Sequence, residues 1–390
     1  MNKSTKIQKN DYQICSSCIY DERVSGISFD EKGVCNYCSQ IEKLKEEFGT
    51  GKKKGEEIFK KIVFEIKKSG KGKKYDCIVG VSGGTDSSYM LYLAKQYGLK
   101  PLAVHYDNTW NSSIATQNIR KVLSALEVDL YTHVVDNKEI DDIFRSFFFA
   151  DVAEIEASTD LALAEVMYRA AWKFKIKYIL DGSSFITEGI TPLGRNYFDG
   201  KYIFSIHKRF GKLPMKTYPL MTFSRFIFWA LFARIKRIQP LRYISYSKES
   251  ARDFLEKSYG WKYYKGHHLE NRMTAFYQSV YSPIKFNTDL RNNSLGALVR
   301  ERKTSRQEAL NEYNKDPFVE KGLVEYFIKR LNLSEKKYNQ IMSRPPKRWT
   351  EYPTYKKYFE RLKFLFFYLA KNNLVPMSFY LKYCLSEKKK

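Results

Sequence analysis

The sequence has no long hydrophobic run, few cysteines and fewer acidic than basic residues. Its most apolar stretch, Phe226–Ala233, lies between Arg225 and Arg234 and is far shorter than the roughly 20 residues of a membrane-spanning helix. A second apolar patch, Phe364–Ala370, is equally short. The N-terminal segment MNKSTKIQKNDYQ has no apolar run, so we expect no secretory signal. These absences predict a cytoplasmic protein without a membrane span.

The scarcity of acidic residues leaves a strongly basic chain. The 390 residues include 68 Lys and Arg against 43 Asp and Glu, a formal net charge of +25. This balance suits a polyanionic partner, an anionic membrane surface or phosphorylated substrates. Because the lysines are scattered, an ordinary solvated basic surface explains it equally well. Hydrophobic residues make up 43% of the chain, which excludes a disordered protein and allows two or three folded units.

Four of the six cysteines form two pairs near the N-terminus. Two Cys-x2-Cys pairs separated by sixteen residues indicate a structural zinc site, because each pair forms a tight knuckle that presents two thiolates. Four thiolates close the metal shell, which favours a structural over a catalytic role; an iron–sulfur cluster is the main alternative. Cys77 is expected to be buried in a strand, and Cys384 receives no role. The predicted zinc ligands are Cys15, Cys18, Cys35 and Cys38.

The middle of the chain alternates strand and helix patterns, which predicts an α/β fold with a doubly wound parallel sheet. The predicted strands are Tyr75–Val81, Lys100–His105, Asp129–Val135 and Lys177–Leu180. The predicted helices are Tyr89–Tyr97, Ile114–Leu126 and Leu161–Phe174. In such sheets, ligands bind beyond the carboxyl ends of the strands.

Changes in composition divide the chain into four segments. Residues 1–45 are predicted to be a zinc-ribbon-like module, and residues 46–74 a charged helical linker with flexible Gly-Lys joints. Residues 75–220 contain the predicted sheet and should form a nucleotide-binding domain. Residues 221–390 are basic, aromatic and mostly helical, and we expect them to contact substrate or partner.

The segment VSGGTDSS follows a strand and opens a helix, which is the context of a phosphate-binding loop. Two glycines let the backbone approach a ligand, and the helix N-terminus offers amide donors and a favourable dipole. Asp86 would repel a bare phosphate, so its expected task is to hold Mg²⁺. No Gly-Lys-Ser/Thr ending is present, so this is not a Walker-type loop. The predicted phosphate-binding residues are Ser82, Gly83, Gly84, Thr85, Asp86, Ser87 and Ser88, of which Ser82 and Asp86 are also predicted to be catalytic.

This loop resembles that of the PP-loop ATP pyrophosphatases, which cleave ATP to AMP and pyrophosphate while adenylating a carbonyl oxygen. Nearly the whole chain resembles the N-acetyl sugar amidotransferases of bacterial surface-polysaccharide and flagellar-sugar pathways. The segments that carry this resemblance are CSSC…ISFDEKGVCNYC, VSGGTDSSYM, VHYDNTWNS, DGSSFITEGI, GHHLENRMTAFYQ and NNSLGALVRERKTSRQEAL. One departure is visible: family members commonly have Gly-Gly-Lys-His where this chain has Lys265-Gly266-His267-His268.

Further site residues follow the later strands or lie in the helical region. The resemblance implies that adenosine is contacted after the second strand, and carboxylates after the fourth strand are placed to help Asp86 hold Mg²⁺. The additional cofactor-binding candidates are His105, Asp107, Asn108, Asp181 and Glu188, with Asp181 also a Mg²⁺ ligand. The substrate-binding candidates are Asn111, Thr187, His267 and Arg272, and His268 and Glu270 are further catalytic candidates.

The resemblance implies an ATP-dependent amidotransferase with Mg²⁺ and structural Zn²⁺. Its substrate would be a nucleotide-linked acetamido sugar, converted to an acetamidino sugar for lipopolysaccharide O-antigen or a flagellar glycan. An acetamido carbon is a poor electrophile, and transfer of AMP to its oxygen creates a leaving group that ammonia can displace. The enzyme would contribute positioning and neutralisation of phosphate charge.

The sequence also predicts that another protein supplies the ammonia. Glutamine hydrolysis needs a nucleophilic cysteine, either at a processed N-terminus or beside a histidine. Residue 2 is Asn2, four cysteines are assigned to metal, Cys77 is expected to be buried, and Cys384 lies far in sequence from His268. We therefore expect a separate glutaminase partner. The resemblance points to a pair like the glutaminase and cyclase subunits of histidine biosynthesis. From its composition alone, part of the basic, aromatic C-terminal half is the expected docking surface.

Two other functions fit parts of the pattern. A PP-loop tRNA-modifying thiolase would share the loop and the zinc ribbon, but it needs reactive cysteines beyond the four zinc ligands. A non-catalytic nucleic-acid adaptor would use the zinc ribbon and the basic surface, yet it has no need of the nucleotide loop. The amidotransferase interpretation needs no nucleic-acid partner.

Overall fold

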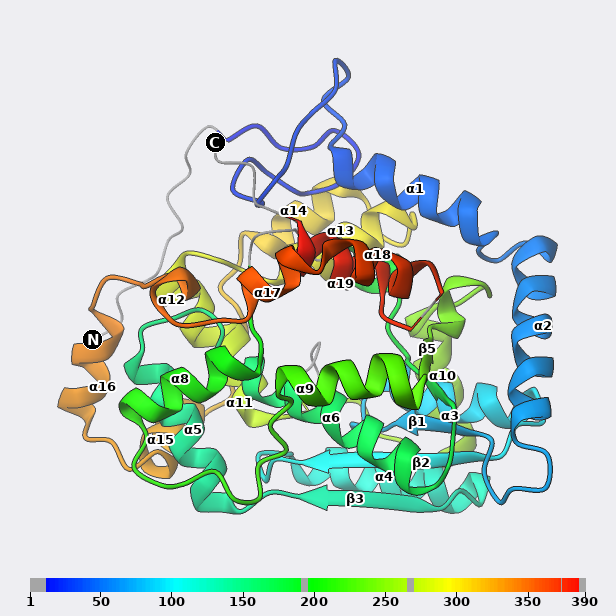
Figure 1. Cartoon of the computed structure of the whole chain (residues 1–390). Coiled ribbons are helices and arrows are strands. Elements are labelled where there is room, and N and C mark those ends of the chain that lie inside the picture. Colours follow the sequence, from blue (N-terminus) through cyan, green and yellow to red (C-terminus); the bar gives the residue numbers. More distant parts are fainter. Residues whose placement is uncertain (1–11, 191–195, 265–269, 373, 386–390) are drawn as a thin grey trace.

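The protein is built around one parallel β-sheet, as the computed structural model in Figure 1 shows. The structure describes residues 12–190, 196–264, 270–372 and 374–385. The strand order is β3-β2-β1-β4-β5, and every neighbouring pair is parallel. The strands are β1 (Cys77–Gly80), β2 (Pro101–Asp107), β3 (Leu130–Val134), β4 (Tyr178–Leu180) and β5 (Lys236–Ile238).

Helices cover both faces of the sheet, which confirms the predicted doubly wound α/β class. Side chains alternate along β1: Ile78 packs into one hydrophobic cluster, whereas Cys77 and Val79 pack into the other. The first cluster includes α5 (Asn137–Phe149) and α6 (Ala157–Lys173). The second includes α2 (Lys53–Ser69), α3 (Thr85–Gln96), α4 (Ser113–Leu126) and α10 (Lys248–Tyr259).

The strand order places the Gly-rich loop at the point where the sheet reverses direction. β1 is the central strand, with β2 and β3 on one side and β4 and β5 on the other. Connections therefore leave the sheet on opposite sides of β1, which opens a crevice at its carboxyl end. Ser82 and the following glycines occupy that end, so the topology puts the loop at the preferred ligand position of this fold class.

Two boundaries expected from the sequence differ from the structure. The sheet does not end before residue 220, because β5 pairs with β4 through Lys236, Arg237 and Ile238. This basic three-residue strand has no apolar pattern, so the sequence contains no signal for it. The predicted charged helical linker is largely the helix α2, which packs into a hydrophobic cluster rather than forming a separate spacer; its buried Phe59, Val63 and Ile66 each stabilise the fold by about 2 kcal/mol.

The N-terminal module docks on the rest of the protein through helix α1 (Asn36–Phe48). Ile41 of α1 packs against Phe185 and Ile186 in the short helix α7 (Phe185–Glu188), which directly follows β4. The module therefore touches the segment that leads away from the carboxyl end of the sheet. In Figure 1 this blue part of the chain lies above the yellow helices α13 and α14.

The region after β5 is mostly helical, as predicted, and it shares a hydrophobic cluster with one face of the sheet. For example, Phe276 stacks on Phe327 with ring centroids 3.6 Å apart, and both lie in the cluster that includes Ile78. Within the described residues no helix is long and apolar enough to cross a membrane. Further elements from α8 onward are α8 (Gly200–Phe210), α9 (Phe223–Ile227), η1 (Phe228–Ala233), η2 (Pro240–Arg242), α11 (Arg272–Phe276), η3 (Tyr277–Tyr281), α12 (Ser282–Phe286), α13 (Arg291–Arg300), α14 (Arg306–Tyr313), α15 (Leu323–Arg330), α16 (Glu335–Met342), η4 (Trp349–Glu351), α17 (Lys356–Arg361), α18 (Lys363–Lys371), α19 (Met377–Phe379) and η5 (Tyr380–Cys384).

Candidate active site and metal centre

The loop between β1 and α3 requires glycine at position 83 and has side-chain atoms packed closely against Gly84. Gly83 has φ +84°, and a Cβ atom there would lie 2.4 Å from the carbonyl oxygen of Ala115. Gly84 is the N-cap of α3, and a Cβ atom on it would lie 2.9 Å from Oε1 of Glu270. Because Gly84 has no side chain to cap the helix, the first-turn amides of α3 remain available to an anion. The loop geometry therefore fits phosphate binding.

Serine hydroxyls and backbone amides hold the loop in shape. The Ser82 amide donates a hydrogen bond to Oγ of Ser87 at 3.3 Å, and the Gly84 amide donates to Oγ of Ser82 at 3.3 Å. The Ser87 hydroxyl donates in turn to the carbonyl oxygen of Gly84 at 3.2 Å. Thr85 and Ser88 are buried in the first turn of α3. These bonds close the turn without using any residue from outside the motif.

Asp86 is bound by two residues that the sequence did not single out. The Tyr246 hydroxyl donates to Oδ1 of Asp86, and Nζ of Lys248 lies 2.6 Å from Oδ2. Both partners come from the segment that follows β5 and starts α10, which packs against α3. A lysine is thus held at the mouth of the loop. It is available to a phosphate group that competes for it with the carboxylate.

Three carboxylates from distant parts of the chain act on this lysine. Burial disfavours the charged form of Lys248, but Asp86, Glu188 and Glu270 outweigh that effect and raise its pKa. Lys248 therefore stays protonated at neutral pH. Burial together with the negative charge of Asp86 also raises the pKa of Tyr246, so this phenol remains a hydrogen-bond donor.

Glu270 reaches the loop from the helical region. It is buried, and its Oε1 accepts a hydrogen bond from the Ser82 hydroxyl at 3.3 Å. The Ser112 amide donates to the Glu270 carbonyl oxygen at 2.8 Å, which fixes the backbone beside the end of β2. Tyr264 also bonds to Glu270, and burial together with this carboxylate raises the pKa of Tyr264 well above its ordinary value. The structure thus brings the predicted Ser82 and Glu270 together.

Residues at the carboxyl end of β2 and just after it form a network that supports the loop. Nδ1 of His105 lies 2.7 Å from the carbonyl oxygen of Val81, and its Nε2 lies 3.2 Å from the amide nitrogen of Asn111. Asn271 donates to Oδ1 of Asn108 at 2.8 Å and to Oδ1 of Asn111 at 3.0 Å. Since His105 and Asn108 are buried with partners on the protein, this geometry favours support of the loop; their contact with adenosine stays a prediction.

Two other predicted acids already have protein partners. Asp107 accepts a hydrogen bond from the Thr109 amide at 2.7 Å. Asp181 pairs with Arg237 of β5, and although burial alone would raise its pKa, the guanidinium and the amide of Ser183 lower it. Among the residues that the structure describes, Asp86 and Asp181 do not belong to a cluster of three or more metal-ligating groups. The Mg²⁺ assignment stays a prediction.

The remaining predicted residues lie apart or cannot be placed. His267 and His268 fall outside the described residues. Arg272 stacks on the ring of Tyr326 at 4.7 Å and lies 3.9 Å from Glu320, so its side chain contacts the helical region. Thr187 lies in α7, one residue before Glu188, with its hydroxyl buried. Sequence reasoning missed Tyr246, Lys248 and Tyr264, because no motif marks them, and it missed Asn271 although this residue lies in the segment GHHLENRMTAFYQ.

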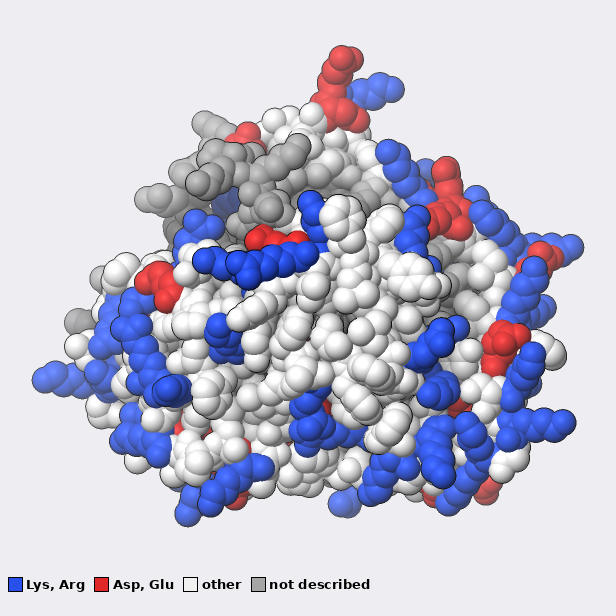
Figure 2. All heavy atoms as spheres, in the orientation of Figure 1, with Lys and Arg blue, Asp and Glu red and all other residues white. Residues whose placement is uncertain are grey.

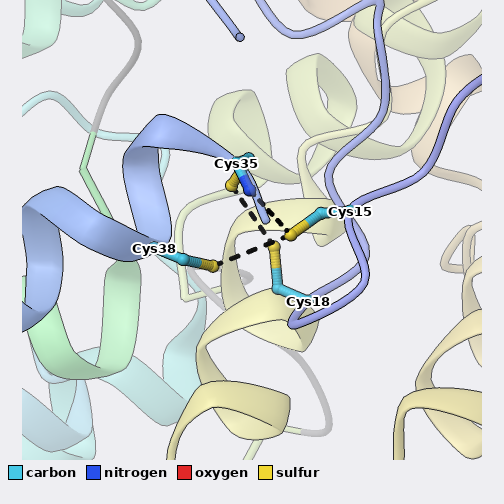
Figure 3. Close-up of side chains that lie close together, drawn as sticks. All are labelled: Cys15, Cys18, Cys35 and Cys38. Carbon is cyan, nitrogen blue, oxygen red and sulfur yellow. Dashed lines mark hydrogen bonds between the residues drawn. The ribbon is translucent and has the colours of Figure 1, made fainter. Parts of the chain in front are cut away.

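The four N-terminal cysteines converge as predicted (Figure 3). Their sulfur atoms all lie within 4.8 Å of one another, with Cys15 and Cys38 4.0 Å apart and Cys18 and Cys35 3.9 Å apart. A tetrahedral zinc ion with Zn–S bonds of about 2.3 Å needs sulfurs roughly 3.8 Å apart, so the geometry fits. All four are buried, which closes the shell to substrate. The geometry and the burial fit a metal centre of structural type.

A partly buried arginine from α13 borders this centre. The guanidinium of Arg300 lies 5.2 Å from the centroid of the Tyr20 ring. Burial opposes its charge, but Tyr20 and the thiols of Cys18 and Cys38 raise its pKa, so it remains a cation. The Tyr20 hydroxyl donates to Asn293 at 2.9 Å. These contacts join the cysteine module to the C-terminal helices.

The helices that meet both centres belong to a described family. Residues 270–365 match the family "LPS biosynthesis protein WbpG-like, C-terminal domain". The C-terminal domain is WbpG-like. This match confirms the resemblance to surface-polysaccharide proteins, and the WbpG-like domain begins at Glu270, the carboxylate that touches the loop.

Similarity to other proteins covers more of the chain than this domain. An uncharacterized protein of Methanocaldococcus jannaschii, MJ1599, is 31% identical over 170 residues, which are 43% of this chain and 58% of that protein. The chain thus matches less than two thirds of that relative's length. Two solved structures align over most of this chain at low scores. The NMN synthetase from Francisella tularensis has a TM-score of 0.30 and 14% identity, covering 73% of this chain and 95% of that chain. The U34-tRNA thiolase NcsA from Methanococcus maripaludis has a TM-score of 0.27 and 15% identity, covering 71% of this chain and 89% of that chain.

Proposed function

We propose that this chain is an ATP-dependent amidotransferase of lipopolysaccharide or flagellar-glycan biosynthesis. It adenylates the acetamido oxygen of a nucleotide-linked sugar and replaces that oxygen with ammonia. The observation that carries the proposal is one contact between the C-terminal helical region and the phosphate loop. The carboxylate of Glu270, the first residue of the WbpG-like domain, contacts Ser82 of the phosphate loop. A sugar-processing domain and a nucleotide loop thereby share one site.

The chemistry places a distinct demand on each group. The acetamido oxygen attacks the α-phosphorus of ATP, and the bond to the β-phosphate oxygen breaks to release pyrophosphate. Amides of the first turn of α3 and the ammonium of Lys248 are positioned to neutralise the departing charge. Ammonia then adds to the activated carbon, AMP leaves with the oxygen, and loss of a proton gives the amidine. Glu270 is the candidate to accept that proton.

Asp86 is the candidate to hold Mg²⁺ when ATP is bound, since a carboxylate is a preferred ligand of this ion. Tyr246 and Lys248, which bind Asp86 in this structure, would then have to release it. Lys248 would bind a phosphate oxygen instead, and Tyr246 would bind the ion or water. The metal would neutralise phosphate charge at the α and β positions.

The thiolase alternative lacks a suitable nucleophile among the described residues. Besides the four clustered cysteines, only Cys77 and Cys384 remain, and both are buried. Burial raises the pKa of Cys77 well above its ordinary value and that of Cys384 to about 12. A thiol in such surroundings is poorly ionised at neutral pH and therefore unreactive.

The test is to incubate the full chain with ATP, Mg²⁺, ammonium at alkaline pH and UDP- or CMP-linked acetamido sugars. We expect AMP and pyrophosphate in equal amounts, and a product in which NH replaces oxygen in the mass spectrum. Release of ADP and inorganic phosphate would contradict the loop assignment. Turnover without any acetamido sugar would contradict the substrate class.

The glutaminase partner is tested with glutamine in place of ammonium. We expect the pure chain to be inactive with glutamine, because the described cysteines are either clustered or buried. Addition of the glutaminase should restore turnover. Glutamine-dependent turnover by this chain alone would refute the need for a partner, while leaving the ammonia-dependent reaction intact.

A further inference from the structure

Helix α18 has apolar side chains on two opposite sides. On the inner side, Phe366 and Leu369 are fully buried. On the outer side, Phe364 is 79% exposed, Tyr368 is 65% exposed and Phe367 is 42% exposed. These three residues are spaced at i, i+3 and i+4, so they form one stripe along the helix. A stripe of aromatic rings in water is unusual for the surface of a monomer.

The inner side holds the helix in this orientation. The ring of Phe226 in α9 lies 6.0 Å from that of Phe366 and 6.1 Å from that of Phe359 in α17. Phe379 of α19 closes the same cluster, 5.5 Å from Phe366. Rotation that buried the outer rings would expose these inner rings instead. The exposure of the outer stripe is therefore built into the packing of α9, α17 and α18.

Basic residues surround the stripe. Lys363 lies 5.1 Å above the ring of Phe364, and Lys371 lies 5.4 Å above the ring of Phe367. The only acid in residues 354–385 is Glu360, which lies 3.7 Å from Lys356. The neighbouring segment 222–243 has no acid at all. The exposed bases on these segments are Arg234, Lys357, Arg361, Lys363 and Lys371.

The apolar surface continues onto the adjacent helix. Phe232 of η1 is 71% exposed, and its ring lies 6.1 Å from that of Phe228. Trp172 of α6 is half exposed and packs 5.1 Å from Phe228. The ring contact between Phe226 and Phe366 joins α9 to α18, and Figure 2 shows a broad uncharged area bordered by blue Lys and Arg atoms. We call the outer residues of α17, α18 and η1 the basic aromatic face.

We propose that the basic aromatic face binds the surface of an anionic phospholipid bilayer. Its aromatic rings would enter the boundary between headgroups and acyl chains, while the surrounding lysines and arginines contact lipid phosphates. Protein interfaces are enriched in aromatic residues but depleted in lysine, whereas this face is rich in both. The single sign of its exposed charge complements anionic headgroups. Membrane contact of this kind needs no spanning helix.

The experiment is co-sedimentation of the full chain with vesicles of phosphatidylcholine alone or mixed with phosphatidylglycerol. We expect binding to the mixed vesicles, much weaker binding to phosphatidylcholine alone, and a loss of binding as salt screens the charges. Phe364→Ser with Tyr368→Ser should lower the partition coefficient about tenfold by removing inserted rings. Lys363→Glu with Lys371→Glu should lower it by a similar or larger factor.

The matched control is Phe64→Ser with Lys68→Glu on α2, where Phe64, which is 65% exposed like Tyr368, lies among lysines outside the basic aromatic face. This variant should bind like the unaltered chain. All variants should keep ammonia-dependent AMP formation in solution, because none of these residues contacts the loop. That activity checks folding and tests the proposed reaction separately.

Three results would overturn the proposal. The first is failure of the unaltered chain to sediment with anionic vesicles. The second is equal vesicle binding by the face variants and the control. The third is that the face variants bind vesicles as well as the unaltered chain does but lose self-association or glutaminase binding. This result would make the face a protein interface.

Discussion

The cysteine centre and the phosphate-loop site are built in opposite ways. All four ligands of the cysteine centre lie between Cys15 and Cys38, so one short segment supplies every sulfur. The loop site draws Ser82, Glu188, Lys248 and Glu270 from segments separated by up to about half the chain. A closed metal shell needs only a local turn geometry. A site that binds and transforms a substrate needs groups on several sides, which only a folded chain can bring together.

The largest expected effect is on the local centre. Cys35→Ser should lose the metal and unfold the N-terminal module, because structural zinc contributes about 10 kcal/mol or more in small modules. Metal content and hydrogen exchange of residues 12–48 measure this directly. Cys384→Ser is the matched control and should retain the metal. If Cys35→Ser kept both the metal and the protection from exchange, the fold of the module would depend on side-chain packing and not on this metal ligand.

The next effect concerns the loop motif itself. Asp86→Asn should lower kcat/KM about a thousandfold, since a neutral amide cannot hold Mg²⁺ against the phosphates. Pyrophosphate release measures the rate, and circular dichroism checks the fold. Asp129→Asn, which changes an exposed aspartate in an ion pair with Lys74, should leave the rate unchanged. Equal rates for the two variants would remove Asp86 from the mechanism.

A smaller effect is expected for a group that only tertiary structure brings to the loop. Lys248→Met should lower kcat/KM for ATP about a hundredfold, because the variant keeps the carboxylates of Asp86, Glu188 and Glu270 but loses their cation. Lys257→Met, on the exposed side of the same helix, is the control. Tighter ATP binding by Lys248→Met would show that the lysine merely occupies the phosphate position.

The smallest effect tests the interface between the cysteine module and the C-terminal helices. Tyr20→Phe removes the hydrogen bond to Asn293 and should lower the free energy of unfolding by about 1 kcal/mol, with the metal retained. Thermal unfolding with metal analysis measures both quantities. Tyr368→Phe removes an exposed hydroxyl and should leave the stability unchanged. A loss of metal from Tyr20→Phe would mean that docking on α13 is required for the centre.

Much of the sheet could be predicted from the sequence, because buried parallel strands are short apolar runs that alternate with amphipathic helices. β1, β2, β3 and β4 fall inside or next to their predicted ranges. β5 could not be predicted, since Lys236, Arg237 and Ile238 form a strand only beside β4. Helix α2 lies in the segment predicted to be a charged helical linker, and the structure adds that its inner side is apolar and buried.

The sequence by itself determined the features that depend on near neighbours: the cysteine knuckles, the glycines of the loop and the order of strands and helices. Their geometry follows from backbone conformation and spacing over a few residues. The tertiary structure alone decided which distant groups meet at the loop. Asp86 binds Lys248, Ser82 binds Glu270, and Asp181 pairs with Arg237, because helix and strand packing brings these side chains within hydrogen-bonding distance. No local pattern encodes such contacts, since each depends on the docking of whole elements.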